Sequence, residues 1–155
     1  MTTAEKLQLK SRLKQFALDL IGQRIAVARE AIDQAQQSAN QEEKSSAGDK
    51  YETSRAMSHL QKDMHSRQLA ENRKELADLH AVNVDALYTS AVPGAFIDCG
   101  GIHFFIAAGL GKHVIEGRTV YFLSPNAPLA QQLQQKRTGD SFLFSKNSTV
   151  ITDLY

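Results

Sequence analysis

An apolar stripe through the first forty residues constrains the fold more than any other feature of this chain. Between positions 4 and 37 there is no proline and only one glycine, Gly22. Two runs of apolar residues follow alternating spacings of four and three along the first forty residues: Leu9, Leu13, Phe16 and Leu20, and then Ile21, Ile25, Ala28, Ile32, Ala35 and Ala39. This spacing places them on one side of an α-helix, which would be roughly 50 Å long at 1.5 Å per residue. Such a helix needs a second helix to cover its stripe.

A second helix is predicted to begin near Asp49. Apolar residues follow a similar spacing in it: Met57, Leu60, Met64, Leu69, Leu76 and Leu79. Between the two stripes, residues 40–48 have no apolar pattern and contain several turn-forming residues. We therefore expect a long antiparallel coiled-coil hairpin over residues 1–82, with its tip at about residues 40–52. A dimerising coiled coil is the alternative that the pattern leaves open.

The remainder of the chain has a different composition. All three prolines, six of the seven phenylalanines and seven of the nine glycines lie after position 90. Short apolar runs at 95–99, 102–106, 112–115, 119–123, 141–144 and 149–152 alternate with turn residues and predict three β-hairpins. A short helix fits residues 127–136, with Asn126 as its cap. We expect the α+β class: the hairpin, a linker over 83–94, and a small antiparallel β domain over 95–155 with one short helix.

Charge and cysteine content exclude several classes of protein. The net charge is +1, and a protein that wraps nucleic acid unaided normally has a basic excess, so nucleic acid would be reached only through a partner. The lone Cys99 excludes an internal disulfide and a cysteine-based zinc site, and its apolar neighbours predict a packed thiol. The sequence has no run of transmembrane length and no apolar region of a signal peptide at its start. We expect a cytoplasmic protein without membrane contact.

Acidic residues gather at the predicted tip: Glu42, Glu43, Asp49 and Glu52. Asp49 and Glu52 are three residues apart, so their side chains would share one helix face. Two carboxylates presented together can hold a Mg²⁺ that keeps several of its waters, and such a metal can activate water in a partner's active site. The same spacing is related to the capping box. Metal binding and capping therefore both remain open.

The other tip residues and the histidines carry weaker signals. Lys50 and Arg55 are expected to be solvated charges, and Tyr51 is an aromatic side chain with little to pack against. These three, together with Glu42 and Glu43, would face a partner. His59 and His65 are six residues apart, which does not suit joint metal binding, and we expect them at the surface. No set of His, Asp, Ser or Cys with catalytic spacing emerges.

Two stretches resemble the bacterial transcript-cleavage factors of the Gre type. The segment from Gly48 to Glu52 is similar to the family's Gly-Asp-x-x-Glu, whose two acids form the metal-binding pair. A later segment is similar to the family's C-terminal signature, a Ser-Pro that opens a short helix ending in Lys and a Gly-Asp turn: Ser124, Pro125, Pro128, Lys136, Gly139 and Asp140. The resemblance covers nearly the whole chain in architecture and indicates a divergent Gre-related branch.

The resemblance implies a partner and a mechanism. The coiled coil would enter the secondary channel of bacterial RNA polymerase, and the C-terminal domain, of FKBP-like fold, would dock at the rim of the channel. Asp49 and Glu52 would help to hold a second Mg²⁺ in the polymerase active site and promote cleavage of backtracked RNA. The protein would then be a monomeric regulator, not an enzyme, with no tightly bound cofactor of its own.

Other functions remain as alternatives. After Glu52 the family usually has Asn and a small-acidic-Tyr run, whereas this chain has Thr53-Ser54-Arg55. A channel binder that inhibits transcription, or competes with other channel binders without stimulating cleavage, is therefore a second expectation. A prolyl isomerase, by analogy of fold alone, and a structural coiled-coil adaptor are the remaining two.

Overall fold

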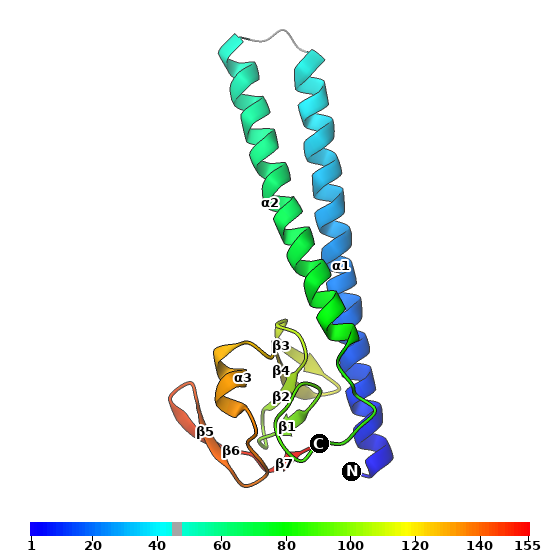
Figure 1. Cartoon of the computed structure of the whole chain (residues 1–155), viewed down its shortest axis with the longest axis vertical. Helices are drawn as coiled ribbons and strands as arrows, with labels where there is room; N and C mark the ends of the chain where they lie inside the picture. Colours follow the sequence, from blue (N-terminus) through cyan, green and yellow to red (C-terminus); the bar gives the residue numbers. More distant parts are fainter. Residues whose placement is uncertain (45–47) are drawn as a thin grey trace. The chain divides into compact units, whose positions relative to one another are not determined.

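The chain folds into two compact units. The structure, a computed structural model, describes the backbone of residues 1–44 and 48–155 and the side chains of residues 1–41 and 52–155. Unit 1 contains Met1–Leu18 and Asp78–Tyr155, and unit 2 contains Asp19–Ala77. Helix α1 (Thr3–Lys44) and helix α2 (Gly48–His80) contribute to both units (Figure 1). A long helical region followed by a sheet domain confirms the α+β class.

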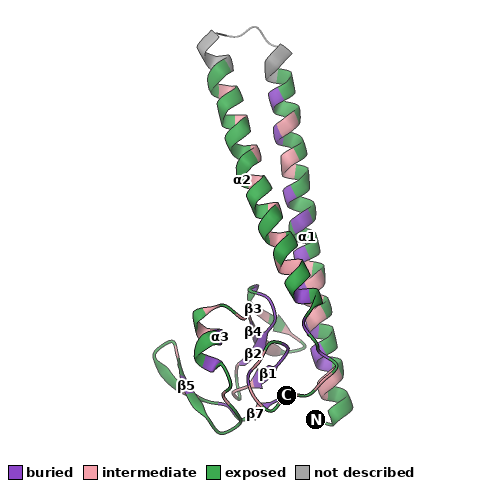
Figure 2. Ribbon diagram, viewed as in Figure 1, coloured by how far each residue is buried: buried purple, intermediate pink, exposed green. Residues whose placement is uncertain are grey.

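Unit 2 is a pair of antiparallel helices that lie side by side (Figure 1). Among its described residues, every buried side chain comes from α1, as the purple segments of Figure 2 show: Ile21, Ile25, Ala28, Ala35 and Ala39. These are members of the predicted stripe. The half-buried side of α2 is largely polar: Ser54, Ser58, Lys62, His65, Leu69, Asn72, Glu75 and Leu76. The Lys62 Nζ donates a hydrogen bond of 2.6 Å to the Gln36 Oε1 across the pair.

The prediction that Met57, Leu60 and Met64 form the inner stripe of α2 is wrong. Their exposed fractions are 55%, 67% and 49%. Spacings of three and four show that residues share a side of a helix, but not which side faces the partner helix. In α2 the side that packs against α1 is the one carrying Lys62 and His65. His65 is half-buried rather than at the surface, whereas His59 is exposed as expected.

Unit 1 is built on a five-stranded sheet in the order β3-β4-β2-β1-β7. The strands are β1 (Phe96–Asp98), β2 (His103–Ile106), β3 (Gly111–Ile115), β4 (Arg118–Leu123) and β7 (Asp153–Leu154). The expected antiparallel pairs β1–β2 and β3–β4 are both present. The sheet is nevertheless mixed, because β4 inserts beside β2 and pairs with it in parallel. Turn residues encode each hairpin, but not the order in which two hairpins join, so the prediction of an antiparallel domain is wrong in this respect.

A separate two-stranded sheet consists of β5 (Ser141–Phe144) and β6 (Asn147–Val150). Its turn residues Ser145 and Lys146 both have positive φ, as do Glu116 and Gly117 between β3 and β4. Two consecutive residues with positive φ are typical of the tight turns that fit the twist of paired strands. The chain then continues to β7, a strand that the sequence did not predict and that pairs with β1.

Both faces of the main sheet are covered within unit 1. On one face Phe104 and Ile106 belong to a buried cluster that includes Leu133 and Phe142. On the other face Phe122 lies 5.6 Å, between ring centroids, from Phe16 of α1. All four residues of β2 are buried, because a strand covered on both sides loses the alternation of apolar and polar residues.

The short helix α3 spans Pro128–Leu133, which is less than the predicted 127–136. Its N-cap residue is Ala127 and makes no side-chain cap, so the prediction of Asn126 as the cap is wrong. Pro128 occupies the first turn, where its missing N–H costs nothing. The helix ends early because the backbone of Gln135 and Lys136 turns to pair with Ala91, through two hydrogen bonds of 3.0 and 2.8 Å.

Neither α1 nor α2, nor any other helix in the described part of the chain, carries an apolar stretch long enough to cross a lipid bilayer.

Candidate functional site

The predicted acidic tip lies where the two long helices of unit 2 connect (Figure 1). Helix α2 begins at Gly48, so Asp49 and Glu52 fall within its first two turns, three residues apart on one face. Glu52 and Arg55 are exposed. The side chains of Glu42, Glu43, Asp49, Lys50 and Tyr51 lie outside the described residues. Among the residues that are described, no group of three or more His, Cys, Asp or Glu side chains comes together for a metal ion.

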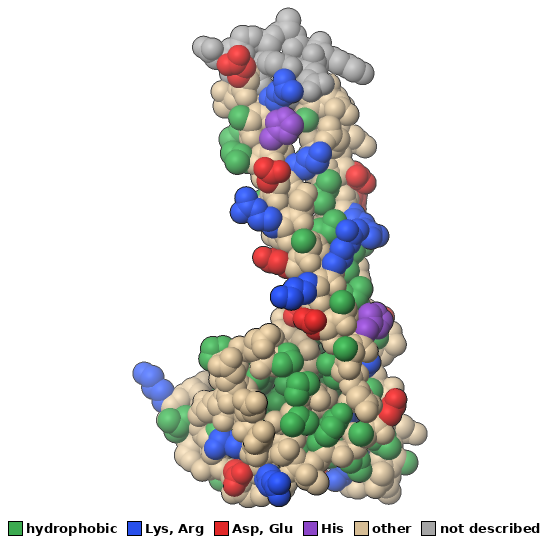
Figure 3. Space-filling view, viewed as in Figure 1, with side chains coloured by type: hydrophobic (Ala, Val, Ile, Leu, Met, Phe, Trp, Pro, Cys, Tyr) green, Lys and Arg blue, Asp and Glu red, His purple; other side chains and the backbone are tan. Residues whose placement is uncertain are grey.

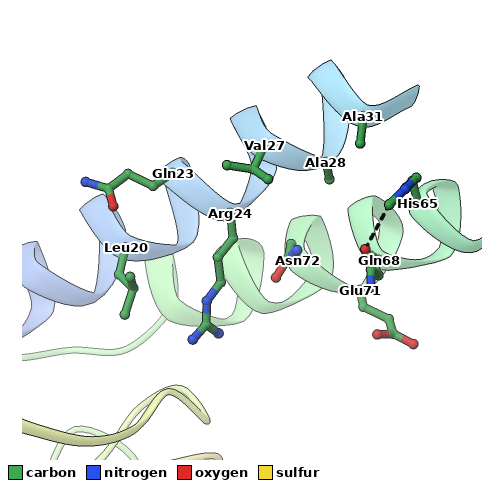
Figure 4. Close-up of a pocket in the computed structure, with 10 residues that line it drawn as sticks. All are labelled: Leu20, Gln23, Arg24, Val27, Ala28, Ala31, His65, Gln68, Glu71 and Asn72. Atoms are coloured by element: carbon green, nitrogen blue, oxygen red, sulfur yellow. Dashed lines mark hydrogen bonds between the residues drawn. The ribbon is translucent and has the colours of Figure 1, made fainter. Parts of the chain in front are cut away.

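A groove of about 500 Å³ runs between α1 and α2 in unit 2. Its α1 side supplies apolar side chains, with Leu20, Val27 and Ala31 beside the buried Ala28, as Figure 4 shows. Its α2 side is polar and is formed by His65, Gln68, Glu71 and Asn72. Grooves with an apolar floor and a few polar groups are the usual form of a binding site.

Charges of both signs line this groove. Arg24 extends from α1 towards α2, and Glu71 stands on the α2 side (Figure 4). The His65 Nδ1 lies 3.3 Å from the Gln68 Oε1. Among the described residues, neither Arg24 nor Glu71 forms an ion pair within unit 2. The groove therefore offers one cation and one carboxylate to a ligand.

Two lysines of α1 join this helix to the chain that follows α2 in unit 1. The Lys10 Nζ donates a hydrogen bond of 2.6 Å to the Ala86 carbonyl and lies 4.6 Å from the centroid of the Tyr88 ring. The Lys10 side chain is fully buried, and burial lowers the pKa of Lys10 to about 8, although Asp85 opposes this shift.

Lys14 contacts the end of α2. Its Nζ donates to the His80 and Val82 carbonyls at 3.2 and 2.7 Å. The His80 carbonyl is at the C-terminal end of α2, where carbonyls lack helical partners and the helix dipole is negative, and the Val82 carbonyl follows two residues later. Lys14 therefore satisfies and neutralises the end at which α2 leaves the helix pair.

The residues of the C-terminal signature have structural roles in unit 1. The Ser124 Oγ accepts the Asn126 N–H at 3.3 Å, and Pro128 starts α3. Gly139 has a φ of +94°, and the Asp140 carboxylate accepts the Arg137 N–H at 2.8 Å. The signature therefore shapes the turn before α3 and the turn between α3 and β5.

A smaller cleft of about 230 Å³ lies beside α3. Val92 and Pro93 line it together with Ile106 and Ala130, and its polar groups are all carboxamides: Asn126, Gln131, Gln134 and Gln135. No titratable side chain lines it, and therefore it offers no acid, base or nucleophile for catalysis.

On the first hairpin, Asp98 precedes Cys99 in the chain and pairs with His103 across the two strands. The Asp98 Oδ1 accepts the Gly100 N–H at 2.9 Å and is 3.3 Å from the His103 Nε2. Burial, and secondarily the Asp98 charge, raises the pKa of the Cys99 thiol to about 11. A thiol held in its protonated form is a poor nucleophile, which fits the expectation of a packed thiol.

Sequence reasoning missed the groove. Of its α1 residues, only Leu20 and Ala28 belong to the predicted apolar stripe, and of its α2 residues only His65 has a prediction, as a surface residue. The one signal for it is that Leu20, Val27 and Ala31 follow each other at spacings of seven and four, beside the stripe that holds Ile21, Ala28 and Ala35. Comparison with protein families, with curated proteins and with solved structures gives no match to this chain.

Proposed function

We propose that the chain is a Gre-like regulator of bacterial RNA polymerase. The helix pair of unit 2 enters the secondary channel of the polymerase as a coiled coil, with the α1–α2 connection leading. One observation carries this proposal: α2 begins at Gly48, so Asp49 and Glu52 stand one turn apart at the end of unit 2 where its helices connect.

The acidic pair acts on the polymerase's own active site. Glu52 is exposed, so it is free to share a Mg²⁺ with groups of the polymerase, and Asp49 on the same face supplies the second carboxylate. A Mg²⁺ held in this way orients and activates a water for cleavage of backtracked RNA. In this proposal the chain supplies carboxylates, and the polymerase supplies the active site.

Unit 1 anchors the protein at the rim of the channel through an FKBP-like C-terminal domain. The support is the signature from Ser124 to Asp140, whose hydrogen bonds shape the turn before α3 and the turn after it. Lys10 and Lys14 tie α1 to residues 80–88, and therefore hold the start of α1 to the rest of the domain.

The experiment is an RNA-cleavage assay on a stalled, backtracked bacterial polymerase. The unmodified chain is expected to accelerate cleavage, and Asp49→Ala with Glu52→Ala is expected to abolish the acceleration while leaving polymerase binding intact. The matched control is Glu30→Ala with Asp33→Ala, because these two acids are also exposed and three residues apart in unit 2. Full cleavage by the Asp49/Glu52 double variant would refute the shared metal.

Inhibition without cleavage is the second candidate function. Thr53 and Arg55 stand on the exposed surface of α2 just after Glu52, in place of the family's usual Asn and acidic residues. A tip with more positive charge holds a cation less tightly. In this case the chain binds polymerase and slows nucleotide addition, and neither acid-to-alanine pair changes RNA cleavage.

A further inference from the structure

The exposed apolar side chains of unit 2 lie beside its groove. Val27 is 68% exposed and lines the groove from α1. On α2, Met57 and Met64 are seven residues apart, and Met64 is four residues before Gln68, which also lines the groove. Residues at these spacings form one row along a helix. We name the docking face by its apolar members: Leu20, Val27, Ala31, Met57, Leu60 and Met64.

The docking face runs obliquely from α1 to α2. Val27 lines the groove together with Gln68, Glu71 and Asn72, whereas Gln36 is bonded to Lys62, so Met57 and Met64 lie further towards the α1–α2 connection than Val27. An oblique strip on two helices is the surface against which a third helix packs in a bundle, at a crossing of about 20°. From the level of Val27 to Met57 the strip is about 20 Å long, or four helical turns.

The charged side chains beside the strip indicate which charges a bound helix would carry. Arg24 and Glu71 border the strip on opposite helices, and no described side chain neutralises either of them. The face drawn in Figure 3 likewise has apolar side chains among charges of both signs. An occupant that places a carboxylate near Arg24 and a cation near Glu71 would satisfy both. Four exposed large apolar side chains make a small area compared with the roughly 800 Å² per partner of a stable dimer, which disfavours a second copy.

We propose that the docking face binds one amphipathic α-helix of the polymerase. This helix presents apolar residues at i, i+3 or i+4, and i+7 to the groove, an acid to Arg24 and a base to Glu71. Methionines at one end of the strip suit such a contact, because their flexible side chains adapt to the helix that they meet. The inference rests on the proposed function, since it takes the polymerase as the partner.

The first test measures the affinity of purified bacterial core polymerase for the full chain and four variants. Val27→Glu and Met64→Glu each place a charge on the docking face. Ala26→Glu and Ser66→Glu are their controls, because both residues are exposed neighbours that point to other sides of the same helices. We expect the two docking-face variants to weaken binding at least tenfold and the two controls to change it less than twofold. Circular dichroism checks that the helix content of all four is unchanged.

The second test identifies the element that covers the face. A photo-crosslinking amino acid replaces Val27 or Met64, and the product is digested and read by mass spectrometry. We expect crosslinks to one helical segment of the polymerase with apolar residues at spacings of three and four. Crosslinks to a strand or an irregular loop would overturn the inference.

The outcomes separate this inference from the proposed function. If all four variants bind polymerase like the unmodified chain, the docking face is wrong and polymerase binding stands. If the controls weaken binding as much as Val27→Glu and Met64→Glu, the face is not specific and the inference fails. If sedimentation shows a dimer that only the docking-face variants break, the occupant is a second copy instead. If the unmodified chain does not bind polymerase at all, both proposals fall.

Discussion

Replacement of Lys10 by methionine tests the buried lysine in unit 1. Methionine keeps the length of the side chain and removes the ammonium, whose pKa burial lowers from 10.5 to about 8. Below pH 8 the lysine is protonated in both the folded and the unfolded chain, so its contribution to stability does not change with pH. Between pH 8 and 10.5 the unfolded chain binds a proton that the folded chain has lost, so the free energy of unfolding rises with pH.

The expected size of this rise follows from the pKa. A shift of one pKa unit corresponds to about 1.4 kcal/mol. If the whole pKa shift of Lys10 applies, the free energy of unfolding rises by about 2 kcal/mol between pH 7.5 and 9.5. The hydrogen bond to the Ala86 carbonyl and the Tyr88 ring favour the charged form, so we expect about 1 to 2 kcal/mol. At pH 7 the variant should differ little in stability, because removing a buried charge offsets the roughly 1–3 kcal/mol cost of leaving the Ala86 carbonyl unpaired.

The assay is urea-induced unfolding of both proteins at pH 7.5, 8.5 and 9.5. Tyr155 and Cys99, whose pKa values are raised to about 12 and about 11, lower the stability of both proteins as pH increases. Subtracting the two unfolding free energies at each pH removes these shared contributions. A difference between the proteins that stays constant from pH 7.5 to 9.5 would show that Lys10 is not held in a desolvating site, and the reasoning would be refuted.

Three further predictions concern unit 1. Gly94→Ala should cost roughly 2–4 kcal/mol in urea unfolding, because a Cβ at this φ of +94° would collide with the Asn83 carbonyl oxygen. Gly100→Ala, with a φ of +90° and no neighbour within 4 Å, should cost about 1 kcal/mol, and equal losses would argue against the contact. Phe16→Ala should lower stability by about 2 kcal/mol in the same assay, since its ring lies 5.1 Å from the His113 ring and 5.6 Å from the Phe122 ring; an unchanged midpoint would contradict this packing. Cys99 should be alkylated by iodoacetamide at pH 8 about 100-fold more slowly than an ordinary thiol, because its pKa is raised by burial to about 11; mass spectrometry follows the reaction, and a rate like that of free cysteine would contradict it.

Local signals in the sequence predicted the elements well. The long stripe predicted α1 and its buried residues, and the turn residues around Gly100 and Gly117 predicted the antiparallel pairs β1–β2 and β3–β4. Each of these depends on residues that are close in the sequence. The parallel pairing of β2 with β4 and the short β7 depend on contacts between distant segments, for which no local pattern exists.

The candidate site, too, could be predicted only where it depends on residues that are close in the sequence. The acidic pair was visible in the sequence because its spacing is a local property of α2. The groove was not, since it depends on which side of α2 turns towards α1. Met57, Leu60 and Met64 have the spacing of an inner stripe, yet they are exposed, and the polar side that includes Lys62 and His65 packs against α1 instead. Helical periodicity alone does not determine which side of α2 faces α1, because α2 carries apolar residues on one side and a hydrogen-bonding lysine on another.

The most direct test of the central claim, that the helix pair of unit 2 enters the polymerase channel, is the position of its α1–α2 end in the bound complex. Ala56 is exposed on α2 one turn after Glu52. An iron chelate attached to Ala56→Cys, in a chain whose own cysteine is removed by Cys99→Ala, generates hydroxyl radicals that cut nearby protein and RNA. We predict cuts in the polymerase segments around its catalytic Mg²⁺ and near the RNA 3′ end of a backtracked complex. Cuts confined to the outer surface of the polymerase, or the same pattern with the chelate on a residue of unit 1, would contradict the account.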